Sequence, residues 1–154
     1  MFFNGMRQFK HSKFLAWIAI LSATSVFAQT ANFGTISLAP GFEPGTAIAT
    51  GSTGGSFSLP SLANRDRHNN FCLGYSGNQT PDHIMTLQQD FAKLNLRVDS
   101  RDTATTLVIK GPNGTIRCGS ATLEDTDWKA GNYSIWVGAK NEGVRTDYTL
   151  SVRQ

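Results

Sequence analysis

Apolar and polar residues alternate in short runs along most of this chain, and glycine, proline and asparagine separate the runs. The clearest run has Leu94, Leu96 and Val98 between polar neighbours. Because the side chains of a strand point alternately to its two faces, such a run predicts a strand with one buried and one wet face. Further strands are predicted at 33–38, 47–50, 71–75, 84–87, 105–110, 115–118, 133–138 and 148–153.

The connections between these runs favour antiparallel pairing. Pro112-Asn113-Gly114 lies between two β-branched runs and is typical of a hairpin turn, because Asn and Gly tolerate a positive φ. The pattern after residue 28 contains short strands without a crossover helix. It therefore predicts an all-β fold, a single antiparallel β-sandwich or jelly-roll-like domain over residues 29–154. Within it, 29–60 are predicted as a partly irregular lead-in and 61–70 as a polar loop.

The alternation also predicts which side chains form the core. Asn95, Arg97 and Arg153 are expected to face solvent, because each follows a core position by one residue. The expected core consists of Leu94, Leu96, Val98, Leu107, Ile109, Ile135, Val137, Leu150 and Val152.

The first 28 residues have the pattern of a secretory signal peptide. Arg7, Lys10 and Lys13 precede an apolar run at 14–21, and 26–28 offer small residues at the positions that a signal peptidase reads. Cleavage is predicted before Gln29. An uncleaved anchor is the alternative, although the apolar run is short for a bilayer. The expected location is the periplasm or the exterior, with no membrane span after cleavage.

The distribution of charge along the chain argues against nucleic acid as a partner. The chain has 14 basic and 11 acidic residues, but three of the basic ones lie in the signal segment, so 11 of each remain in 29–154. Binding to nucleic acid requires clustered positive charge. The sequence after residue 28 shows no such cluster, and nucleic acid is therefore not an expected partner.

Cys72 and Cys118 are the two cysteines of the chain. In an oxidising compartment, two cysteines in one small domain are expected to form a disulfide. Two free buried thiols are the alternative. A zinc site or a Cys-His catalytic pair is disfavoured, because two lone cysteines supply neither the ligand set of the first nor the motif of the second.

Glu124, Asp125 and Asp127 form an acidic group that is a candidate calcium site, because Ca²⁺ takes oxygen ligands from carboxylates, carbonyls and water. Asp99 and Asp102 could join them if the loops meet. The spacing is not that of an EF-hand, and a solvated acidic loop is the favoured alternative. No other cofactor is expected.

Residues that could carry catalysis do not form a motif. Asp66, His68, Asp82 and His83 lie in polar surroundings, and no Gly-x-Ser-x-Gly elbow is present. Both histidines are expected on the surface beside loops. The protein is therefore not expected to be an enzyme.

Trp128, Trp136 and Tyr133 raise the possibility of a carbohydrate platform, since aromatic faces stack on sugars. Alternation, however, places Tyr133 and Trp136 on opposite faces of one strand. Packing in the core is therefore the favoured role for these rings.

Several short motifs follow one another in the second half of the chain. They are Pro81-Asp82, the strand at 94–98, Asp102 ahead of 106–109, the turn at 111–114, the strand at 131–138 and the terminal strand at 148–152. In this order they resemble the bacterial pre-peptidase C-terminal domain family, small β-sandwich modules of exported proteins. Relatives often carry an acidic run after the second cysteine, whereas here Gly119-Ser120-Ala121 follow Cys118.

The resemblance implies a fold and a compartment. Members of the family usually accompany a catalytic domain, often a secreted protease, without being catalytic themselves. The expected function is thus an exported, non-catalytic binding or structural module whose partner is a secreted protein or a glycan. Alternatives are an accessory or inhibitor-like partner of a secreted protease, and a small hydrolase or peptidase.

Overall fold

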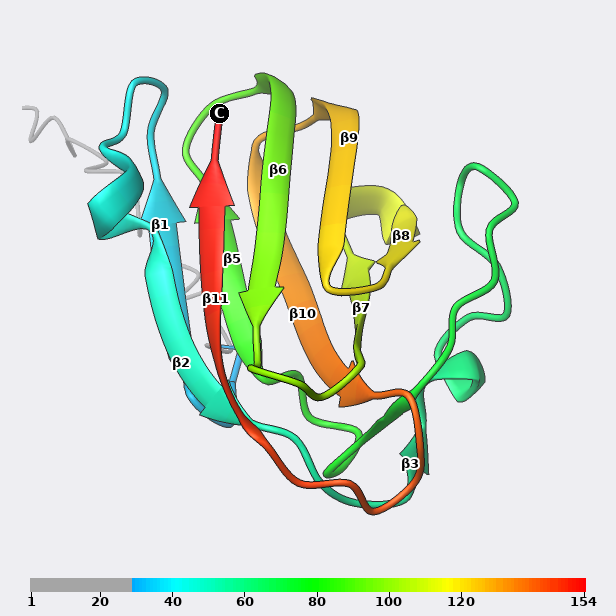
Figure 1. The fold of residues 1–154 in the computed structure, drawn as a ribbon. Helices are drawn as coiled ribbons and strands as arrows, with labels where there is room; N and C mark the ends of the chain where they lie inside the picture. Colours follow the sequence, from blue (N-terminus) through cyan, green and yellow to red (C-terminus); the bar gives the residue numbers. More distant parts are fainter. Residues whose placement is uncertain (1–28) are drawn as a thin grey trace, which may run out of the picture.

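The computed structural model describes residues 29–154, which form two β-sheets packed face to face (Figure 1). One sheet has seven strands and the other has four. The predicted signal peptide, residues 1–28, lies outside the described residues. Within 29–154, no helix is long and apolar enough to cross a membrane. The expected all-β sandwich is confirmed.

The larger sheet is built on five strands that run in the order β1, β5, β10, β7 and β8. Their bounds are Gly34–Leu38, His83–Leu87, Gly131–Ala139, Thr105–Lys110 and Ile116–Gly119. Two short strands, β4 (Tyr75–Ser76) and β3 (Phe57–Ser58), continue from the end of β10.

The smaller sheet has the order β2, β11, β6 and β9. Its strands are Ile48–Ser52, Asp147–Arg153, Phe91–Asp99 and Thr122–Trp128. Three short 3₁₀ helices lie in the connections: η1 (Pro44–Thr46), η2 (Leu59–Ser61) and η3 (Pro112–Gly114), the last in the predicted hairpin turn.

The pairing within the two sheets is antiparallel except between β1 and β5, which run parallel. β1 lies at one edge of the larger sheet and β2 at one edge of the smaller sheet. The segment 29–60, predicted as a partly irregular lead-in, contains β1, β2 and β3, which are all paired parts of the sandwich, joined by irregular connections.

The main core lies between the sheets, and the predicted alternation is confirmed. All nine expected core residues are at most 3% exposed. Arg97 and Arg153 face solvent, and Asn95 is half-buried. Because a slip of one residue would exchange these faces, the hydrophobic pattern sets the register of β6 and β11.

A second apolar cluster lies on the other face of the larger sheet. Val108 and Trp136, directly opposite each other on β7 and β10, pack there with Leu59 and Cys72. The chain around Phe57–Ser61 and Cys72 covers them. β7 and β10 are thus buried on both faces, which explains why β7 is a nearly continuous apolar and β-branched run.

Two local predictions are wrong. The run at 71–75 does not form a strand: Phe71 makes one bridge to Arg65, and Gly74 adopts a φ of 107° before β4 begins at Tyr75. Glu124, Asp125 and Asp127, for which a solvated acidic loop is the favoured expectation, lie instead on the strand β9. Its inward positions include Asp125, so the apolar pattern of a strand is interrupted.

Candidate functional site

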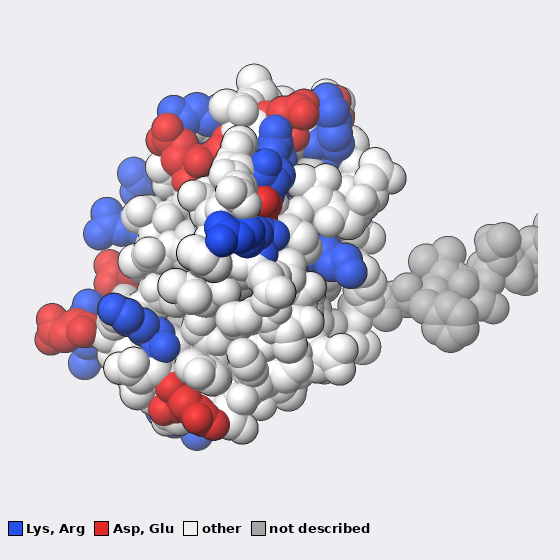
Figure 2. Space-filling model, turned by 90° about the vertical axis from the view of Figure 1, so that its right-hand side faces the viewer, with Lys and Arg blue, Asp and Glu red and all other residues white. Residues whose placement is uncertain are grey.

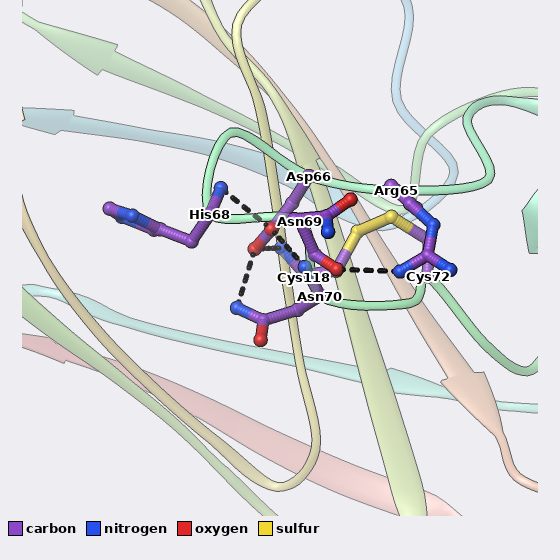
Figure 3. Close-up of a disulfide and its surroundings, with 7 residues drawn as sticks. All are labelled: Arg65, Asp66, His68, Asn69, Asn70, Cys72 and Cys118. Atoms are coloured by element: carbon purple, nitrogen blue, oxygen red, sulfur yellow. Dashed lines mark hydrogen bonds between the residues drawn. A yellow bond between two sulfur atoms is a disulfide. The ribbon is translucent and has the colours of Figure 1, made fainter.

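A disulfide joins Cys72 to Cys118 and anchors residues 62–74, here called the excursion, to β8. The two Cα atoms are 5.2 Å apart, and the predicted pairing is confirmed. Figure 3 shows Asp66 at the centre of this anchor, accepting hydrogen bonds from the backbone N–H groups of His68, Asn70 and Cys118. The excursion is therefore attached to β8 by a covalent bond and by a hydrogen bond, and Asp66 also orders its own turn.

Beside the disulfide, Arg117 of β8 is buried in a set of partners. It is 2% exposed, and its Nε lies 2.7 Å from Oδ2 of Asp125. Its Nη2 donates to the carbonyl oxygens of Thr126 and Asp127, and its guanidinium lies 4.1 Å from the centre of the Trp128 ring. A buried charge needs such partners, so this cluster is a structural tie between β8 and β9.

Each of the three acidic residues proposed as calcium ligands has a cationic partner. Glu124 lies 2.8 Å from Lys93, Asp127 lies 2.8 Å from Lys129, and Asp125 is bound by Arg117. Within residues 29–154, no group of three or more His, Cys, Asp or Glu side chains is placed to hold a metal ion.

The electrostatics of Asp125 show how firmly it is engaged. Burial alone would raise its pKa, but hydrogen bonds from His68 and the Thr126 N–H, together with the charges of Arg117 and Arg67, lower it below its usual value. Asp125 is thus held as a carboxylate by cations of both β8 and the excursion.

The two histidines of residues 29–154 have different environments. The His68 side chain is half exposed, as predicted, with Nε2 2.9 Å from Asp125. His83 is fully buried on β5, where Nε2 lies 2.9 Å from the Tyr148 hydroxyl and Nδ1 has no partner. The prediction of a surface position for His83 is wrong, because β5 directs this ring between the sheets toward β11.

Asp82, next to His83, is also buried and accepts hydrogen bonds from the Val137 N–H and from Asn32. Burial raises the pKa of Asp82 to about 6 and lowers the pKa of His83 to about 4. Neither histidine is hydrogen-bonded to a serine or cysteine within the described chain. Within 29–154, neither histidine is therefore placed to activate a serine or a cysteine.

The aromatic residues considered as a sugar platform are buried. Trp128, Tyr133 and Trp136 are at most 5% exposed, and Tyr133 and Trp136 pack in different clusters on opposite faces of β10. Their expected role in packing is confirmed.

Two depressions of the described surface lie on the outer side of the four-stranded sheet. One of about 990 Å³ and one of about 390 Å³ adjoin each other, and Arg97, Ser151 and Arg153 line both. We call this surface the polar face. Its further charged or polar members are Thr50, Ser52, Lys93, Asn95, Asp99, Arg101, Thr122, Glu124, Asp147, Thr149 and Gln154.

Strand register places cations of the polar face next to one another. Arg97 is opposite Ser151, and Arg153 is opposite Asn95, so the two arginines are diagonal neighbours on one face. Lys93, two residues from Asn95, is the other diagonal neighbour of Arg153. Lys93 has Glu124 as its partner, but within 29–154 no carboxylate oxygen lies within 4.0 Å of a guanidinium nitrogen of Arg97, Arg101 or Arg153.

Adjacent like charges without counterions oppose folding. The packing of the fold therefore does not explain why Arg97 and Arg153 are neighbours. The sequence identifies Arg97 and Arg153 as exposed, but only the register brings them together.

The side of the molecule that carries β8 and the excursion has a different surface. Figure 2 shows basic and acidic side chains interspersed toward its upper end, and a broad uncharged area below them. Exposed there are Phe71 and Leu73, at 62% and 56%, beside the disulfide. The guanidinium of Arg65 lies 3.7 Å from the centre of the Phe71 ring.

Comparisons with known proteins add no relative: no protein-family model matches the chain, and no curated protein matches it.

Proposed function

We propose that the protein is an exported, non-catalytic binding module that binds its ligand on the polar face. The observation that carries this proposal is the group of Arg97, Arg101 and Arg153, which line one depression without a carboxylate partner within 4.0 Å among residues 29–154. Their guanidinium groups are free to bind an anionic ligand bidentately.

Further support comes from the residues that could do chemistry. Asp125, Asp82 and His83 are each occupied by contacts that hold strands or the excursion in place. A hydrolase needs a base within reach of a nucleophile. The resemblance to pre-peptidase C-terminal domains agrees with a non-catalytic role, and the signal sequence and the disulfide agree with export.

A binding survey tests the proposal. The protein is passed over immobilised glycans and secreted proteins, together with the variant Arg97→Gln/Arg153→Gln and the control Lys110→Gln/Lys140→Gln, whose exposed lysines lie outside the polar face. We expect a ligand that retains the wild type and the control but not the arginine variant. Equal retention of all three proteins, or turnover of peptide or ester substrates by the wild type, would contradict the proposal.

A second candidate function is docking onto a secreted protease as an accessory or inhibitor-like protein. The observation that favours it is the exposed pair Phe71 and Leu73 on a disulfide-anchored segment, because apolar anchors on a rigid support are typical of protein interfaces. In the same survey, Phe71→Ser/Leu73→Ser would then abolish retention on a protease, whereas the arginine variant would be retained.

A further inference from the structure

We infer that the ligand of the polar face is a linear acidic polysaccharide whose sugars carry carboxylates. The inference rests on the proposed function and names its ligand class. It starts from the smaller depression, which is lined by Lys93, Arg97 and Arg153 and by one acidic side chain, that of Glu124. Because Glu124 is occupied by Lys93, the two arginines provide the unmatched positive charge.

The rest of the lining is suited to sugar hydroxyls. Thr122 and Ser151 offer hydroxyl groups, and Asn95 and Gln154 offer amides, which both donate and accept hydrogen bonds. In the adjoining depression, Asp99 and Asp147 are acceptors without an ion-pair partner within 29–154. A polymer that alternates hydroxyl groups with spaced carboxylates can satisfy both the arginines and these acceptors.

Two other classes of partner, nucleic acid and protein, fit the polar face less well than an acidic polysaccharide. A nucleic acid presents closely spaced phosphates, which Asp99 and Asp147 would repel. A protein partner would require an apolar or aromatic centre in the interface. Among the described residues that line the two depressions, only Phe33 and the buried Tyr148 are aromatic, and no aliphatic residue larger than glycine is present. Ile48, an exposed apolar residue of β2, lies on the edge strand.

An aromatic ring does lie at the rim. Phe33 is 45% exposed and lines the larger depression, where its ring packs edge-on against Tyr148. It is supported from beneath by the His83–Tyr148 pair. A supported, exposed ring beside hydroxyls and guanidinium groups can stack on the apolar face of a sugar at one end of the groove.

The test compares charged polysaccharides with an uncharged polymer that has the same backbone as one of them. Affinity electrophoresis measures binding of the folded protein to polygalacturonate, to alginate, to fully methyl-esterified polygalacturonate and to dextran sulfate. We expect binding to at least one polyuronate, weakened by salt, and no binding to the methyl ester, because esterification removes the charge and keeps the sugars. In Arg97→Gln/Arg153→Gln the Kd should rise by about tenfold or more, since each arginine contributes charged hydrogen bonds. In Lys110→Gln/Lys140→Gln it should stay within about twofold.

Each contrary outcome overturns the inference in a distinct way. Equal binding of the methyl ester, still lost in the arginine variant, would reject the acidic ligand and keep the binding module. Equal losses in the arginine and lysine variants would show nonspecific attraction. Stronger arginine-dependent binding to dextran sulfate would assign the site to sulfate. Binding to no polyuronate rejects the ligand class, whereas the survey of glycans and proteins decides on the function itself.

Discussion

Arg117 and Arg97 are the same type of residue on two strands of one small domain, yet their surroundings are opposite. Arg117 is buried, with a carboxylate, two carbonyl oxygens and an indole ring as partners. Arg97 is exposed beside Arg153 and has no carboxylate within 4.0 Å among residues 29–154. The first arrangement stabilises the fold, whereas the second costs a little stability and leaves a cation available. The difference separates a structural charge from a candidate binding charge.

The largest expected effect comes from Arg117→Ala. Removal of this side chain leaves Asp125 buried without its main cation and leaves the Asp127 carbonyl oxygen without its side-chain donor. We expect the free energy of unfolding to fall by about 3–5 kcal/mol in urea denaturation. The matched change Arg97→Ala should alter it by only about 0.5 kcal/mol. Comparable losses in the two variants would show that the two arginines do not differ as described.

The disulfide beside Arg117 should have the next largest effect. Cys72 and Cys118 are 46 residues apart, and opening a loop of that length costs about 4 kcal/mol by loop-closure entropy. Cys72→Ser/Cys118→Ser should therefore lower the free energy of unfolding by about 2–5 kcal/mol. Thiol titration of the unreduced wild type in denaturant should find no free thiol. Two reactive thiols, or a stability unchanged in the variant, would contradict the structural role of this bridge.

Asp82 and His83 are buried, like Arg117, but without an oppositely charged partner within the described chain, and this predicts opposing pH dependences. The folded pKa of Asp82, about 6, lies above the ordinary value of 3.8 for an aspartate. Protonation therefore favours the folded state, and stability falls as the pH rises from about 4 to 6. The folded pKa of His83, about 4, lies below 6.5, so stability rises with pH between about 4 and 6.5. Each group changes the free energy of unfolding by about 3 kcal/mol over this pH range. Because the two changes have opposite signs, they largely cancel in the wild type.

Single substitutions should make the pH dependence of each of the two groups measurable on its own. Relative to the wild type, Asp82→Asn should gain stability as the pH rises from about 4 to 6, and His83→Gln should lose it. Urea denaturation at several pH values measures both slopes. The carboxylates elsewhere contribute equally to all three proteins and drop out of the comparison. Parallel curves for the two variants would mean that at least one of the groups is not buried as described.

The contrast between structural and free charges also explains what the sequence could predict. The strands around Leu96 and Ile135 follow from local alternation, because each buries one face against the other sheet. β9 was missed because its inward position 125 is a carboxylate that is acceptable only opposite Arg117, and because the φ of 56° at Asp127 shifts the pattern before Trp128. Neither cause can be seen in the local sequence.

The candidate site was less predictable than the fold. Arg97 and Arg153 were correctly expected on the surface, but their proximity depends on the pairing of β6 with β11, which are distant in sequence. His83 has polar neighbours in the sequence, and its burial depends on Tyr148 reaching across the sandwich from β11. Predictions from local pattern succeed for faces of strands and fail where a partner comes from a distant strand.

The smallest expected effect tests whether the polar face really holds unmatched charge. Arg153 lies diagonally next to both Arg97 and Lys93, so Arg153→Gln should relieve repulsion and raise the free energy of unfolding by about 0.2–0.5 kcal/mol at low salt. In 1 M salt the screening length falls to about 3 Å, and the gain should disappear. Lys140→Gln, which removes an equal charge outside the polar face, should show no such salt-dependent gain.

If Arg153→Gln instead destabilises the protein at both salt concentrations, Arg153 makes a structural contact, and its role would be that of Arg117 rather than that of a ligand-binding residue. A small gain that salt removes would mean that the fold tolerates an avoidable repulsion, which is the stability cost expected of a binding surface.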